Sequence, residues 1–93
     1  MTLNKYDKQR LQGAEEIVLR IKAFAMEKGI TFLECRCNGG REITSSDRHL
    51  LEVQARGKNS KGIFSDEQLI GYPLGISTER TDCALREMVC NLA

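Results

Sequence analysis

Apolar residues recur at helical spacing over residues 7–28 and predict a long amphipathic helix. One broad apolar face contains Leu11, Ala14, Ile17, Val18, Ile21, Phe24 and Ala25. Gly29 follows the last apolar position, where glycine ends many helices because it adopts a left-handed backbone conformation without strain. Gly13 lies inside the helix and is expected to weaken its first turns by about 1 kcal/mol.

The pattern then changes to alternation, which predicts strands. Over residues 30–37 apolar and charged side chains alternate, and Asn38 begins a turn-forming stretch. Residues 46–56 allow two interpretations. Alternating apolar and polar residues favour a strand, whereas Ser46 could cap a helix that ends before Gly57. We favour the strand.

A third strand is predicted to begin at Ile63, after a flexible turn over residues 57–62. Ser65 and Gln68 have the spacing of a capping box, which predicts a short helical turn. After a loop at residues 73–75, a final helix is expected to start with Ser77 or Thr78 as its cap. Its apolar stripe contains Ala84, Leu85, Met88, Val89 and Leu92.

The predicted order is therefore helix, strand, strand, strand, helix within a single domain, residues 1–93. Two amphipathic helices must both cover their apolar stripes. The simplest arrangement packs them on one face of a small three-stranded antiparallel sheet, which is an α+β fold.

Charge is distributed unevenly along the chain. Residues 20–61 contain nine Lys and Arg and five acidic residues, a net charge of +4. Residues 62–93 contain two basic and five acidic residues, a net charge of −3. Such a dipolar distribution indicates a binding protein with one face for an acidic partner.

The N-terminus has no apolar segment typical of a secretory signal, and no apolar run is long enough to cross a membrane. We therefore expect a cytoplasmic protein that does not associate with a membrane. In that compartment the four cysteines are expected to be reduced thiols.

Two cysteines, Cys35 and Cys37, share one strand face and could contribute to a zinc site with His49 and one helical cysteine. Cys83 and Cys90 cannot both bind that ion, because about 10 Å of helix axis separates them. The usual Cys-x2-Cys pairs are absent, so we predict no metal and no cofactor.

Catalytic signatures are also absent from the sequence. His49, the only histidine, follows Asp47 and Arg48 in a stretch that could equally be a polar loop. A small enzyme with a Cys/His site is thus the third hypothesis. We predict no enzymatic activity and no catalytic residues.

Nucleic-acid binding is the alternative hypothesis for the basic middle of the chain. Its candidate residues are Arg36, Arg41, Arg48, Arg56, Lys58 and Lys61. The isoelectric point of about 7.7 lies below the values typical of such domains. Phe32 and Phe64 are expected in the core, so no aromatic side chain is interleaved with the basic residues to stack on bases.

The element order resembles that of double-stranded-RNA-binding domains. Those domains carry a lysine-rich start to the last helix, which contacts the groove. The corresponding positions here, residues 77–82, read Ser-Thr-Glu-Arg-Thr-Asp and are acidic. The resemblance is therefore limited to the order of elements and does not indicate membership.

A second apolar row on the first helix provides the leading hypothesis. Leu19, Ala23 and Met26 are spaced four and three residues apart, outside the main apolar face. This row predicts a contact surface for a protein partner or a homodimer, as in a small regulator, adaptor or inhibitor. The alternative is a helix buried on more than half of its circumference.

Overall fold

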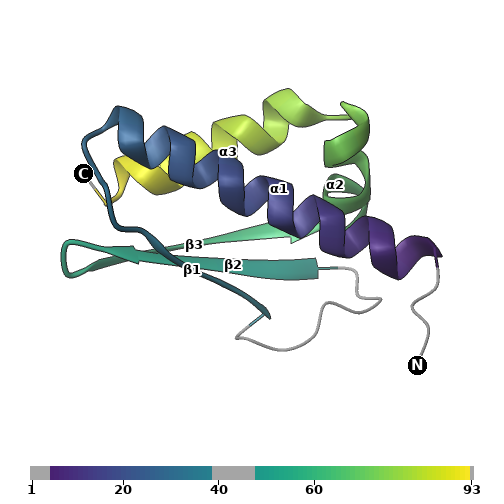
Figure 1. Ribbon diagram of the computed structural model, residues 1–93, viewed down its shortest axis with the longest axis horizontal. Helices are drawn as coiled ribbons and strands as arrows, with labels where there is room; N and C mark the ends of the chain where they lie inside the picture. The colour runs from purple at the N-terminus through teal and green to yellow at the C-terminus, as the bar shows by residue number, and fades with distance from the viewer. Residues whose placement is uncertain (1–4, 39–47, 93) are drawn as a thin grey trace.

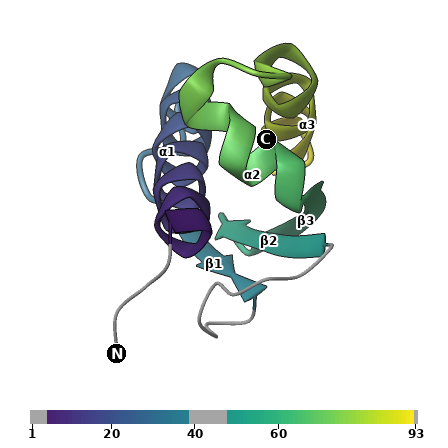
Figure 2. The same cartoon turned by 90° about the vertical axis from the view of Figure 1, so that its right-hand side faces the viewer.

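The structure is a computed structural model that describes residues 5–38 and 48–92, and it has the predicted α+β fold (Figure 1). In chain order its elements are α1 (Lys5–Glu27), β1 (Glu34–Cys37), β2 (Arg48–Ala55), β3 (Lys58–Ser65), α2 (Asp66–Gly71), the 3-10 helix η2 (Tyr72–Leu74) and α3 (Thr78–Cys90). Helices α1 and α3 lie on the same side of the sheet (Figure 2). No described helix covers the opposite face of the sheet.

Helix α1 ends as the sequence predicts. Gly29 has a φ of 78°. Its N–H donates to the carbonyl of Met26, and the N–H of Ile30 donates to the carbonyl of Ala25. This pair of hydrogen bonds is a Schellman motif. It turns the chain so that Ile30 enters the core.

The prediction of a strand over residues 46–56 is confirmed for the described part, because β2 is the central strand of the antiparallel order β1-β2-β3. Its alternate side chains His49, Leu51, Val53 and Ala55 are buried. The predicted strand over residues 30–37 is shorter than expected, since pairing begins only at Glu34. Phe32 lies before that point and is 89% exposed, so the prediction that it is a core residue is wrong.

The predicted turn over residues 57–62 is also wrong. The turn between β2 and β3 contains only Arg56 and Gly57, because Ala55 already pairs with Lys58. Both turn residues have positive φ, 53° and 74°, which is the signature of a type I′ turn. Such a turn reverses the chain in two residues, so the polar residues after it continue as a strand.

The core lies between the helices and the covered face of the sheet. It contains Ala14, Ile17, Ile21, Phe24, Ala25, Ile30, Leu51, Val53, Ala55, Phe64, Leu69, Leu85, Met88, Val89 and Leu92. Phe64 therefore occupies the predicted position. Leu11, in contrast, is 42% exposed, because the helix extends past the sheet at this end.

Gly13 is a packing residue. A Cβ atom added there would overlap the backbone carbonyl oxygen of Leu69, so the glycine allows α1 and α2 to pack closely.

Helix α2 begins with the predicted capping box, in which Gln68 N–H donates to Ser65 and Ser65 N–H donates to Gln68 Oε1. Ser77 occupies the cap position of α3, although its side chain makes no capping hydrogen bond. Across the described residues, no helix has the length and apolar character needed to span a membrane.

Candidate functional site

The outer row of α1, defined as Leu19, Ala23 and Met26, lies on the surface. Leu19 is 67% exposed, Met26 is 68% exposed, and Ala23 is also exposed. The opposite side of the helix carries the buried Ile17 and Ile21. The helix is therefore buried on one face only, and the alternative of a largely buried helix is wrong.

A shallow depression of about 560 Å³ adjoins this row. Leu19 and Ala23 line it from α1, and Tyr72 and Pro73 line it from η2. Pro73 lies in residues 73–75, which the sequence pattern predicts to be a loop. The depression exists because η2 packs beside α1, which neither segment shows in its own sequence pattern.

Polar contacts connect Tyr72, Asp82 and Arg20, which all line this depression. The hydroxyl of Tyr72 donates to Asp82 Oδ1 over 2.6 Å, and Arg20 Nε lies 3.8 Å from the same oxygen. Burial, followed by this hydrogen bond, raises the pKa of Tyr72 to about 12. Tyr72 is therefore a stable neutral donor at physiological pH. Arg20 also lies over the ring of Phe24, 5.0 Å from its centroid.

Glu16 lines the same depression and contains an unusual atom. Its Oε2 is buried and has no hydrogen-bond partner among the described residues. A buried carboxylate oxygen without a donor is unfavourable. A ligand or partner that supplied a donor at this position would remove that cost.

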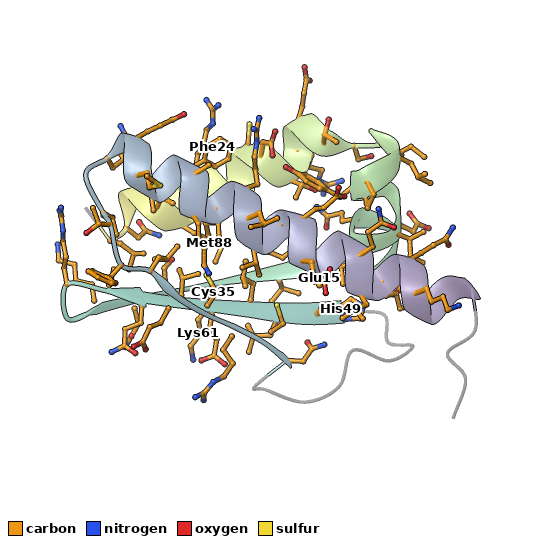
Figure 3. The ribbon with its side chains drawn as sticks, viewed as in Figure 1. Glu15, Phe24, Cys35, His49, Lys61 and Met88 are labelled. Carbon is orange, nitrogen blue, oxygen red and sulfur yellow. The ribbon has the colours of Figure 1, made fainter. Side chains whose placement is uncertain are left out.

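The basic candidate residues do not form one continuous patch. Arg36 and Lys61 lie on either side of Glu52 in one cross-strand row. Lys61 projects from the uncovered face of the sheet (Figure 3). Arg56 lies in the hairpin turn and donates to the carbonyl of Gly29 over 2.8 Å. Arg48 begins β2 and Lys58 begins β3. Arg41 lies outside the described residues.

A hollow of about 620 Å³ lies along the sheet and is lined by residues of all three strands and by Lys22 of α1. Arg36 and Lys61 line it, but so do the acidic Glu34 and Glu52. Two carboxylates beside the three cations Lys22, Arg36 and Lys61 leave a net charge of only +1, which attracts phosphate groups weakly. This arrangement does not strengthen the nucleic-acid hypothesis.

The cysteines are divided between two parts of the molecule. Cys35 and Cys37 are half-buried on β1, and burial raises the pKa of both thiols. Cys83 and Cys90 are exposed on α3. Within residues 5–38 and 48–92, no three Cys, His, Asp or Glu side chains are grouped as a metal site would require.

A partly buried polar cluster, Arg10, Asn38, His49 and Asp66, is absent from the sequence-based expectations. Arg10 donates to both carboxylate oxygens of Asp66, from Nε over 2.7 Å and from Nη2 over 2.9 Å. His49 Nε2 lies 2.9 Å from Asp66 Oδ1. The Arg10 guanidinium, with a smaller effect from His49, holds the pKa of Asp66 below its ordinary value. The cluster joins α1, β2 and α2.

Asn38 determines the tautomer of His49. The N–H of Leu50 donates to Asn38 Oδ1, so the amide nitrogen of Asn38 faces His49 Nδ1 at 3.2 Å. That nitrogen is a donor, so Nδ1 accepts and the ring proton resides on Nε2, which donates to Asp66. His49 is thus a buried strand residue rather than part of a polar loop, and both ring nitrogens are occupied.

One weak signal for this cluster exists in the sequence. His49 has the same parity as Leu51 and Val53 in β2, so alternation alone places it on the buried face. Nothing local links it to Arg10, which is 56 residues from Asp66.

Comparison of the chain with protein-family models, curated proteins and solved structures finds no match in any of the three.

Proposed function

We propose that this protein is a non-enzymatic protein-binding module whose partner docks on the outer row of α1 and the adjoining depression. The observation that carries the proposal is the exposure of Leu19, Ala23 and Met26 together in the folded protein. Isolated exposed apolar residues are common, but three in one helical row form a continuous apolar strip.

The chemistry of the surface favours a helix as the docking element. A single row on a straight helix packs against the row of another helix, and the small Ala23 between the two larger side chains permits close approach. Glu16 Oε2 has no hydrogen-bond donor among the described residues, so a partner that docks here should supply one. The expected partner helix therefore presents an apolar row with a Lys or Arg at its border.

The chemistry of the remaining candidate residues supports a non-enzymatic function. The raised pKa values of the Cys35 and Cys37 thiols disfavour the thiolate form that a cysteine nucleophile requires. His49 is enclosed by Asn38 and Asp66, so neither ring nitrogen is available to a substrate.

Replacing both Leu19 and Met26 with glutamate is expected to abolish partner capture and any self-association while leaving the fold intact. Each surface change should alter the free energy of unfolding by less than about 0.5 kcal/mol. Loss of the two apolar contacts should weaken binding by about two orders of magnitude or more. Circular dichroism measures the fold, and light scattering and affinity capture measure association.

Lys22→Glu is the matched control, since it lies exposed on the same helix and changes the net charge by the same amount as the double substitution. It should retain binding. If the protein dimerises through the row, the partner is a second copy of this chain and not a different protein. A folded double variant that associates like the wild type would contradict the proposal.

The nucleic-acid alternative has its own expected result. We expect no complex with duplex DNA or RNA above background at physiological salt, because Glu34 and Glu52 offset most of the positive charge that Lys22, Arg36 and Lys61 bring to the hollow. Electrophoretic mobility shift measures this directly. If a complex forms, and if Arg56→Ala, Lys58→Ala and Lys61→Ala together weaken it and flatten its salt dependence, the alternative is correct.

A further inference from the structure

The edge strand β3 offers a second interaction surface, separate from α1. It pairs with β2 on one side, and none of the described elements pairs with its other side. An unpaired edge of this length is a template for another extended segment, because every second residue along it directs its backbone N–H and C=O groups away from β2.

The hairpin turn determines which backbone groups lie on the open side. Ala55 and Lys58 close a two-residue turn and therefore exchange hydrogen bonds with each other. Because antiparallel pairs alternate, the backbone groups of alternate residues along β3 then bond to β2. The residues between them, Asn59, Lys61 and Ile63, direct their N–H and C=O groups to the open side.

The side chains of these same three residues lie on the uncovered face of the sheet. Asn59 and Lys61 are exposed, and Ile63 is 62% exposed. Figure 3 shows Lys61 projecting away from the helices. An added strand would thus place alternate side chains beside Lys61 and Ile63, where cross-strand neighbours interact.

Charge determines which segment fits this edge. Strand β3 contains two lysines and no acidic residue. Lys61 makes no ion pair with any residue in the described ranges, although Glu52 is its cross-strand neighbour. Pairing of β3 with a second copy of itself would bring like charges together on one face, which is unfavourable.

We propose that an extended segment of a partner protein adds to β3 as a fourth strand, with an acidic side chain beside Lys61 and an apolar side chain beside Ile63. The proposal does not depend on docking at α1, because the two surfaces share no residue. Backbone hydrogen bonds to Asn59, Lys61 and Ile63 hold the segment, and the two side-chain positions select it.

Amide hydrogen exchange measured by NMR tests the proposal. In the free protein, the amides of Asn59, Lys61 and Ile63 should exchange faster than those of Ser60 and Gly62. The probe is a synthetic peptide as long as β3. Every second residue of the peptide is threonine, and the residues between are glutamate and valine. At millimolar concentration it should slow exchange at the three outward amides and leave the other two unchanged.

Lys61→Glu is the matching variant, with its fold checked by circular dichroism. It should bind the acidic peptide about fivefold more weakly and should prefer a peptide that carries lysine in place of glutamate. Lys61→Gln serves if the glutamate variant does not fold, and should also weaken binding of the acidic peptide.

The variant with Leu19→Glu and Met26→Glu should bind the acidic peptide like the wild type, which separates this surface from α1. Equal affinity for the acidic and basic peptides, or no slowing of exchange at the three amides, would overturn the proposal.

Discussion

Replacing Gly13 with alanine is expected to lower the free energy of unfolding by about 2–3 kcal/mol. The added methyl group would overlap the carbonyl oxygen of Leu69, a backbone atom that cannot move without displacing α2. The sign of the change in the free energy of unfolding distinguishes two effects of the substitution. In an isolated helix, alanine is more favourable than glycine by about 1 kcal/mol. Helix propensity alone therefore predicts stabilisation, whereas the α1–α2 contact predicts the opposite. Urea unfolding monitored by circular dichroism distinguishes the two.

Gln12→Ala is the matched control, because Gln12 precedes Gly13 in α1 and is exposed. It should change stability by less than about 0.5 kcal/mol. A Gly13→Ala protein that is as stable as the wild type, or more stable, would show that α1 and α2 are not packed this closely.

Replacing Asp66 with alanine is expected to destabilise the protein by about 3 kcal/mol. The substitution removes the acceptor for two hydrogen bonds from Arg10 and one from His49, and both of those residues are buried. A buried guanidinium without its carboxylate is far less favourable than the intact pair. Glu67→Ala is the control, since Glu67 lies exposed in the same first turn of α2. Its effect should stay within about 1 kcal/mol. Equal effects of the two substitutions would contradict a stabilising function for the cluster.

Acid titration provides an independent measure of the same cluster. The pKa of Asp66 is lowered in the folded protein, chiefly by the hydrogen bond from Arg10. Its ionised form therefore contributes stability that is present above the unfolded-state pKa, about 3.9, and is lost as the pH falls through the folded-state pKa. Asp66→Asn removes this titration, so its stability should fall less steeply than that of the wild type below about pH 4. Parallel curves for the two proteins would exclude Asp66 as a source of acid sensitivity.

Local signals predict the elements where a residue acts through its own neighbours. The capping box at Ser65 and the glycine end of α1 involve contacts within five residues, and both are confirmed. The hairpin turn also depends on neighbours, but the prediction of a long flexible turn is wrong because Arg56 adopts a positive φ that its residue type does not indicate. Helical spacing separates the outer row of α1 from the main apolar face, but only the folded structure shows that the row is exposed, because the sequence also allowed a largely buried helix.

The sequence by itself determines the α+β class and the main apolar face that α1 packs on the sheet. These properties depend on hydrophobic periodicity, which is encoded locally at 3.6 or 2 residues per repeat. Tertiary structure alone decides the partners of Arg10 and His49, the packing function of Gly13, the depression beside Leu19 and the open edge of β3. Each of these depends on where two segments distant in sequence meet. Periodicity indicates which face of a segment is buried, but it does not specify which residue of another segment lies against it.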